Sequence, residues 1–183
     1  MESIKEKELI HMLADPKTER KAFGILVNQY GEKLYWQIRR IVLTHDDAND
    51  VLQNVFLKAW NNLDSFRNES KLSTWLYRIA VNQSLDFMRS NSRRTGISLE
   101  ECDNGIANTL AADRYFDGDK TEALLIQAIS RLPEVQRTVF NMRYYDNMKY
   151  SEISKILNTS EGALKASYHI AVKKISEYFN SID

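Results

Sequence analysis

The chain has 183 residues, 43% of them hydrophobic, and its 25 basic and 25 acidic residues give a net charge of zero. This composition is typical of one or two small globular domains and excludes an intrinsically disordered chain. No apolar run reaches membrane-spanning length, and the N-terminus MESIKEKELI lacks the continuous apolar core of a secretory signal, so we expect no membrane insertion. The lone cysteine, Cys102, excludes an internal disulfide and favours the reducing cytoplasm.

The charges are unevenly distributed along the chain. Residues 1–94 carry a net charge of +3, residues 95–124 carry −5, and residues 125–183 carry +2. Two mildly basic ends therefore flank an acidic connecting segment, although the net charge by itself argues weakly against a nucleic-acid-binding protein.

In the first half, apolar residues recur at three- and four-residue steps, which predicts helices. These helices are expected over residues 4–14, 18–43, 46–62 and 73–90. Asp46 or Asp47 is predicted to cap the third, and Ser73 or Thr74 the fourth, because short polar side chains accept hydrogen bonds from free N–H groups at helix starts.

The segment 95–119 has no sustained period, is acidic and contains three glycines, so it is predicted to be a flexible linker. Helical periodicity resumes at Lys120, and four further helices are expected over residues 120–132, 133–144, 151–157 and 160–179. No strand pattern occurs. We therefore predict an all-α chain of two small helical domains, residues 1–94 and 120–183, joined by the acidic linker.

The last two predicted helices have the spacing of a helix-turn-helix. A small residue, Ser154, lies where the second helix crosses the first, and Asn158 follows four residues later, where the turn needs a left-handed backbone. Leu164, six residues further on, would anchor the second helix in the core. Thr159 or Ser160 is predicted to cap this helix.

The second of these helices has two different faces. Its core face is expected to hold Leu164, Tyr168, Ala171 and Ile175, at steps of four, three and four. The opposite face holds residues that are short or flexible, as insertion into a major groove of DNA requires: Glu161, Gly162, Lys165, Ala166, His169 and Lys173. The alternative is an ordinary helical hairpin with a solvated face.

Aromatic and basic residues alternate around residues 58–94. The aromatic residues are Trp60, Phe66, Trp75 and Tyr77, and the basic ones are Lys58, Arg67, Lys71, Arg78, Arg89, Arg93 and Arg94. This mixture suits single-stranded nucleic acid, because unstacked bases need flat partners and phosphates need positive charge. The alternative is that the tryptophans are plain core residues.

Four blocks of the sequence together resemble a known family. They are DDANDVLQNVFLKAW, SFRNESKLSTWLYRIAVNQSLDFMR, LPEVQRTVFNMRYYDNMKYSEIS and SEGALKASYHIAVKK. In this order and spacing they resemble the extracytoplasmic-function (ECF) sigma factors of the sigma-70 family, the promoter-specificity subunits of bacterial RNA polymerase. The resemblance covers roughly residues 22–92 and 121–179.

The resemblance implies three sets of site residues. The polymerase-binding set, on the third helix, is Asp50, Gln53 and Asn54. The set that reads the melted −10 element is Phe66, Arg67, Asn68, Lys71, Trp75, Asn82, Arg89, Arg93 and Arg94. The set that reads the −35 element as duplex is Ser160, Glu161, Gly162, Lys165, Ala166, His169 and Lys173. Asp86 is expected to hold a neighbouring basic side chain.

The resemblance implies a transcription initiation factor, without enzymatic activity, cofactor or metal, whose partners are the two largest subunits of core RNA polymerase and promoter DNA. It leaves open an anti-sigma factor as a further partner. Three rival functions stand beside this one: a dimeric response-regulator-like factor, an enzyme and a protein-interaction bundle. The first would need an α/β domain, and the second lacks ligand-spaced histidines or a phosphate loop.

Overall fold

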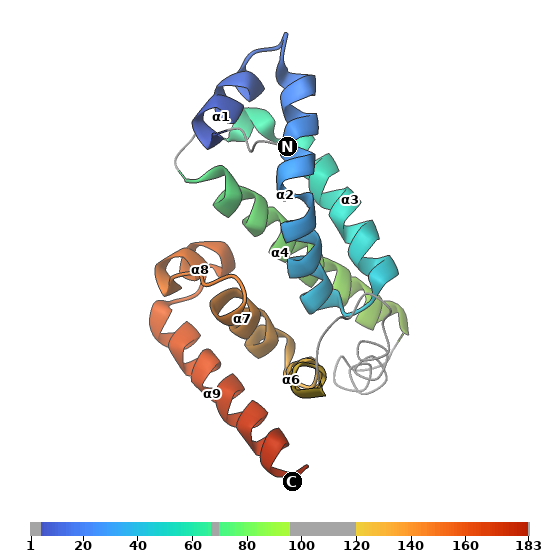
Figure 1. Cartoon of the computed structure of the whole chain (residues 1–183), viewed down its shortest axis with the longest axis vertical. Coiled ribbons are helices and arrows are strands. Elements are labelled where there is room, and N and C mark those ends of the chain that lie inside the picture. Colours follow the sequence, from blue (N-terminus) through green and yellow to red (C-terminus); the bar gives the residue numbers. More distant parts are fainter. Residues whose placement is uncertain (1–4, 67–69, 96–119, 183) are drawn as a thin grey trace.

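The computed structural model describes residues 5–66, 70–95 and 120–182. Their regular structure consists of α-helices and one 3-10 turn, without a strand, which confirms the all-α prediction. The first half contains α1 (Glu6–Ala14), α2 (Glu19–Val42), α3 (His45–Asn61), η1 (Leu63–Ser65) and α4 (Leu72–Thr95). The second half contains α6 (Lys120–Ser130), α7 (Glu134–Tyr144), α8 (Tyr150–Leu157) and α9 (Glu161–Asn180) (Figure 1). The predicted linker lies outside the described residues, apart from Thr95.

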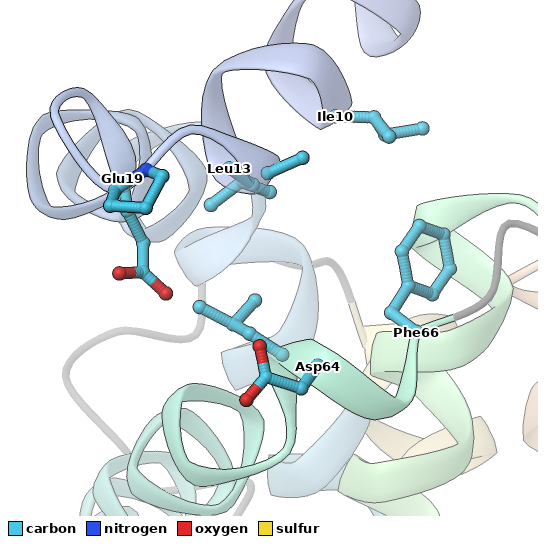
Figure 2. A pocket seen from close by; sticks show the side chains of 8 residues that line it. Ile10, Leu13, Glu19, Asp64 and Phe66 are labelled. Carbon is cyan, nitrogen blue, oxygen red and sulfur yellow. The ribbon is translucent and has the colours of Figure 1, made fainter.

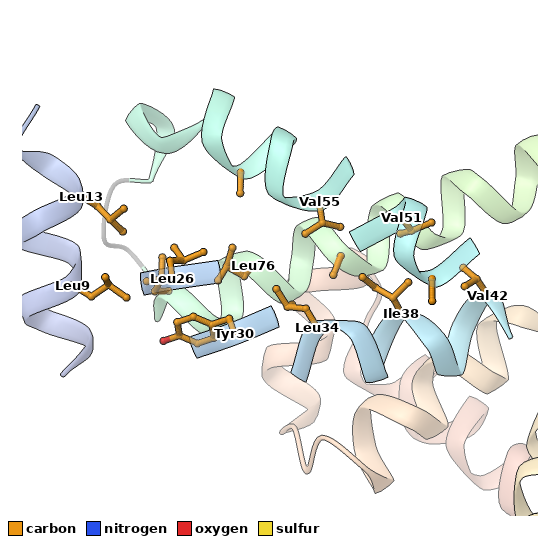
Figure 3. Packing of buried hydrophobic residues seen from close by; sticks show 14 of the residues in the cluster. Leu9, Leu13, Leu26, Tyr30, Leu34, Ile38, Val42, Val51, Val55 and Leu76 are labelled. Atoms are coloured by element: carbon orange, nitrogen blue, oxygen red, sulfur yellow. The ribbon is translucent and has the colours of Figure 1, made fainter. Parts of the chain in front are cut away.

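Helices α1–α4 form the N-terminal bundle, in which α2, α3 and α4 run side by side and α1 crosses one end (Figure 1). The predicted apolar faces of these helices meet in one core. Figure 3 shows side chains from all four helices converging, and the labelled ones include Leu9, Leu26, Leu34, Ile38, Val55 and Leu76. Burial of such aliphatic side chains stabilises a fold by about 1.5–3 kcal/mol each.

The start of α3 differs from the prediction. Thr44, not Asp46 or Asp47, is the capping residue, and its hydroxyl accepts a hydrogen bond of 3.2 Å from the Asp47 N–H. Thr44 has the extended backbone of an N-cap residue, whereas both aspartates already lie within the first helical turn. There their charges favour the positive end of the helix dipole.

The start of α4 also differs from the prediction, which placed the cap at Ser73 or Thr74. The helix begins at Leu72, so both hydroxyl residues lie in its first turn. The N–H of Leu72 donates instead to the Glu6 carboxylate of α1, at 2.7 Å. The first N–H group of α4 is therefore satisfied by a tertiary contact, and the helix begins before the two residues that were predicted to cap it.

Helices α6–α9 form the C-terminal bundle. One of its cores lies between α6, α7 and α9 and includes Leu132, Phe140 and Ala171; the other joins α7 to α8 and α9. Pro133 directly precedes α7, one position earlier than predicted. The Tyr178 hydroxyl donates to the Gln127 side chain at 2.6 Å and so joins α9 to α6.

The two bundles are in contact. Helix α7 packs on α2, and α8 packs on α4, whereas α9 lies on the far side of α7 and α8 (Figure 1). Ile41 of α2 and Val81 of α4 are buried in the same cluster as Val139 and Met142 of α7 and Ile153 of α8. The relative placement of the bundles was not predicted from the sequence.

Candidate nucleic-acid interface

The turn between α8 and α9 has the conformation that the sequence predicted. Asn158 adopts a left-handed backbone with φ of 51°, and its N–H donates to the Ser154 carbonyl. This conformation is tolerated better by asparagine than by other non-glycine residues. Leu164 is fully buried and anchors α9 against α8. The three spaced positions thus form a helix-turn-helix.

Ser160 caps α9, since its side chain accepts a hydrogen bond of 3.3 Å from the Ala163 N–H. This settles the choice between Thr159 and Ser160 that the sequence left open. Glu161 follows in the first turn, where its charge opposes the helix dipole favourably. The local sequence therefore fixes where α9 begins and which residues face outward from its first turns.

The outward face of α9 is exposed along its length. The exposed members of the predicted −35 set are Ser160, Glu161, Gly162, Lys165, Ala166, His169 and Lys173, while Leu164, Ala171 and Ile175 are buried beneath them. A Cβ built on Gly162 meets no atom within 4 Å, so the fold does not require glycine there. Small side chains at this end of α9 leave space for a partner to approach the backbone.

The cations of this face are held only weakly. The Lys173 ammonium lies 3.8 Å from the Glu177 carboxylate, and both side chains are well exposed. Exposed pairs of this kind contribute between 0 and about 1 kcal/mol, so Lys173 can exchange this partner for a phosphate. Lys165 lies over the ring of Tyr150, 5.8 Å from its centroid, with its charge still at the surface.

The predicted −10 set follows α4 and the chain before it. Phe66 lies against Trp75, with ring centroids 5.3 Å apart, and both rings are half-buried. Lys71, Asn82 and Arg89 are exposed. Arg67 and Asn68 lie outside the described residues, as do the side chains of Arg93 and Arg94 in the last turn of α4.

Asp86 holds Arg89 at 3.6 Å, as expected for a carboxylate beside a basic residue on the same helix. The aromatic group proposed from the sequence is not continuous. Trp60 packs against Phe23 of α2, with ring centroids 4.9 Å apart, rather than against the loop. Tyr77 packs in both the N-terminal core and the cluster between the bundles. Of the four aromatic residues, therefore, Phe66 and Trp75 remain as a pair at the loop.

A hollow of about 340 Å³ lies beside Phe66, between the end of α1 and η1 (Figure 2). Polar and apolar groups contribute about equally to its walls, and Glu19 and Asp64 supply two carboxylates; the lining residues are Ile10, Leu13, Ala14, Pro16, Glu19, Leu63, Asp64 and Phe66. Among the described residues, none that lines the hollow carries a positive charge. The hollow therefore suits a flat, uncharged group with hydrogen-bond donors better than a phosphate.

The predicted polymerase-binding residues, Asp50, Gln53 and Asn54, are all exposed on α3. The same face continues to Leu57, which is 61% exposed and was not singled out from the sequence. The sequence contained a signal for it, because Leu57 follows Asp50 by seven residues, or two helical turns, and lies outside the predicted apolar face of this helix. A single exposed leucine is common on protein surfaces, so Leu57 extends the exposed face of Asp50, Gln53 and Asn54 but does not by itself mark a binding site.

Within the described ranges, none of the helices has the length and apolar character needed to cross a bilayer. Nor does any group of three or more histidine, cysteine, aspartate or glutamate side chains in those ranges have an arrangement that could hold a metal ion.

Comparison with known proteins gives two family matches, Sigma-70 region 2 over residues 26–94 and Sigma-70, region 4 over residues 122–175. The ECF RNA polymerase sigma factor SigW of Bacillus subtilis is 32% identical over 161 residues, covering 84% of this chain and 86% of SigW. The ECF RNA polymerase sigma-E factor of Escherichia coli K12 is 31% identical over 158 residues, covering 82% of each chain. The fold is similar to that of Bartonella quintana RpoE in its complex with the anti-sigma factor NepR, with a TM-score of 0.68 and 20% identity over 87% of this chain and 98% of that one.

Proposed function

The chain belongs to the extracytoplasmic-function (ECF) sigma factors of the sigma-70 family, and from this premise we propose how its two bundles share promoter recognition. Its general role is that of a transcription initiation factor that directs RNA polymerase to promoters. We assign residues 1–94 to polymerase binding and the −10 element, residues 120–183 to the −35 element, and residues 95–119 to the connection between them. The factor acts by binding and needs no cofactor.

The C-terminal bundle is proposed to read duplex DNA at the −35 element. The single observation that carries this proposal is the capped, exposed face of α9, held by Leu164 and the left-handed Asn158 turn. Lys165, Ala166 and His169 would face base edges in the major groove, because a recognition helix presents its early turns to the bases. Lys173 lies two turns later and would meet a phosphate, which positions the helix without reading sequence.

The N-terminal bundle is proposed to capture an unstacked base of the −10 element. Phe66 and Trp75 offer aromatic surface beside the hollow near the loop, which has room for one base. A base must leave the stack before its faces and pairing edge are accessible. Base–aromatic stacking contributes about 1–3 kcal/mol per base, and the exposed cations Lys71 and Arg89 would hold the backbone of the parted strand.

Binding of core polymerase is assigned to the outer face of α3, where Asp50, Gln53 and Asn54 lie on the same exposed side as Leu57. Polymerase would then hold the factor while the N-terminal bundle binds open DNA more tightly than duplex. Promoter melting follows from this difference in affinity, because a ligand shifts an equilibrium toward the state that it binds better. An anti-sigma factor is proposed as a further partner, by analogy with the relative that binds NepR, and the cytoplasm as the place of action.

The test is run-off transcription with bacterial core polymerase and the chain's native upstream sequences. A promoter-dependent transcript that requires the factor is the expected result. In parallel, the holoenzyme should bind a DNA with a preformed bubble at the −10 element more tightly than the intact duplex. Absence of any promoter-dependent transcript, or equal affinity for bubble and duplex, would overturn the proposal.

A further inference from the structure

The contact between the two bundles contains an apolar part. Ile41 of α2 and Val81 of α4 are 1% and 0% exposed, and residues of the C-terminal bundle cover both side chains. Separation of the bundles would expose both side chains to water. Each buried aliphatic side chain therefore favours the packed arrangement, since removal of apolar surface from water is the main favourable term in association.

The same contact contains a polar part that joins residues more than 100 positions apart. The Arg40 guanidinium of α2 lies 3.0 Å from the carboxylate of Asp146, which follows α7. Arg40 also covers the ring of Tyr145, 4.5 Å from its centroid. Its backbone carbonyl accepts a hydrogen bond of 3.1 Å from the Asn141 side chain. Arg40 is thus the centre of the polar contact.

This packed arrangement does not allow both promoter elements to be read at once. By their numbering, positions −35 and −10 are about 25 base pairs apart, which is about 85 Å along B-form DNA. A compact chain of this length is only roughly 40 Å across, and helices in direct contact, as α8 and α4 are, have axes about 8–10 Å apart. The bundles must therefore separate before the factor spans a promoter.

The contact is also built in a way that allows separation. Within the described part of the chain, Asp146 Oδ2, Arg40 Nε and Asn141 Oδ1 are buried and have no hydrogen-bond partner. Buried polar atoms without partners regain hydrogen bonds to water when the bundles part, which offsets some of the apolar burial. Contacts of this mixed character are typical of domains that move relative to one another.

We propose that the packed arrangement is an inactive resting form of this sigma factor, closed by the apolar Ile41–Val81 surface, with Arg40 lying against Asp146, Tyr145 and Asn141 across the contact. Core polymerase binds the separated form, so closing lowers the apparent affinity for polymerase by the ratio of closed to open molecules. This inference rests on the proposed function for the need to span two elements. The existence of the closed form does not depend on the proposed function.

The test measures compaction of the full chain by small-angle X-ray scattering, without polymerase or DNA. Arg40→Glu and Asp146→Lys each place like charges face to face, and Val81→Asp places a carboxylate in the apolar contact. Arg20→Glu makes the same charge change at an exposed position of α2 and is the matched control. We expect a compact wild type and control, and a radius of gyration larger by about a third in the three variants, with helicity unchanged by circular dichroism.

The double variant Arg40→Glu, Asp146→Lys restores opposite charges and should be more compact than either single variant. A wild-type chain that is already extended, single variants as compact as wild type, or a double variant as extended as both singles would overturn the proposal. The opened variants should also bind core polymerase several-fold more tightly than wild type, and weaker binding would contradict the inactive character of the closed form. A compact wild type that gives no promoter-dependent transcript would instead refute the proposed function alone.

Discussion

Lowering the pH from 7.5 to 5.5 is expected to favour the closed form, because Asp146 is buried in the contact between the bundles. Burial raises the pKa of Asp146 from 3.8 to about 6, against the opposing attraction of Arg40. Burial prevails because only one carboxylate oxygen is bonded to Arg40, while Asp146 Oδ2 has no partner among the described residues. The pKa of Tyr145 is raised to about 12 and that of Tyr77 is also raised, mainly by burial, so both phenols stay neutral over this pH range.

The sign and size of the effect follow from linkage. A raised pKa means that the closed form binds the proton more tightly than the open form, in which Asp146 has its ordinary pKa of 3.8. This contribution to closing is fully present below the ordinary pKa and is lost as the pH rises through about 6. When the pH is lowered from 7.5 to 5.5, the ratio of closed to open molecules should rise about fourfold, which corresponds to about 0.8 kcal/mol.

The closing equilibrium can be measured by single-molecule energy transfer. Dyes on cysteines introduced at Lys33 of α2 and Lys174 of α9, both exposed, report the separation of the bundles after Cys102 is replaced by serine. Asp146→Asn removes the titrating group and should abolish the pH dependence without unfolding either bundle. An equilibrium that does not change with pH in the wild type, or that changes equally in Asp146→Asn, would refute the reasoning.

Three further predictions concern α9 and its turn. Lys165→Ala and His169→Ala should each change preference at the −35 element by about 1–3 kcal/mol in holoenzyme binding to mutated promoters, without changing core binding. Leu164→Ala should destabilise the chain by about 2–5 kcal/mol in chemical unfolding, because it leaves a cavity under α9. Asn158→Ala should destabilise it by about 1–2 kcal/mol because of the left-handed backbone, whereas Gly162→Ala should leave stability unchanged or higher and act only on DNA binding.

Each of these predictions has a contrary outcome. Altered core binding by Lys165→Ala would place that residue on a polymerase surface rather than a DNA surface. A neutral Leu164→Ala would mean that α9 is not held by this contact. Equal losses of stability from Asn158→Ala and Gly162→Ala would show that the turn has no special backbone requirement.

The helix-turn-helix could be predicted almost completely from the sequence. Asn158, Ser160 and Leu164 act within a few residues of their own positions, through backbone conformation, capping and helical spacing. Such interactions are local, so a single sequence contains nearly all the information that determines them. Local capping residues did not predict the start of α4 correctly. The N–H of Leu72, its first residue, is satisfied by Glu6, which is 66 residues away.

The sequence by itself determined the all-α class of the described residues and which face of α9 is exposed, whereas the assignment of that face to nucleic acid stays a prediction. Only the tertiary structure decided that Trp60 packs against α2 and that the bundles close on each other. Periodicity placed Ile41 among the apolar residues of α2 but did not say what covers it, and it gave no reason to pair Arg40 with Asp146. Helical spacing records which side of a helix avoids water; the choice of the partner surface depends on how distant segments pack in three dimensions.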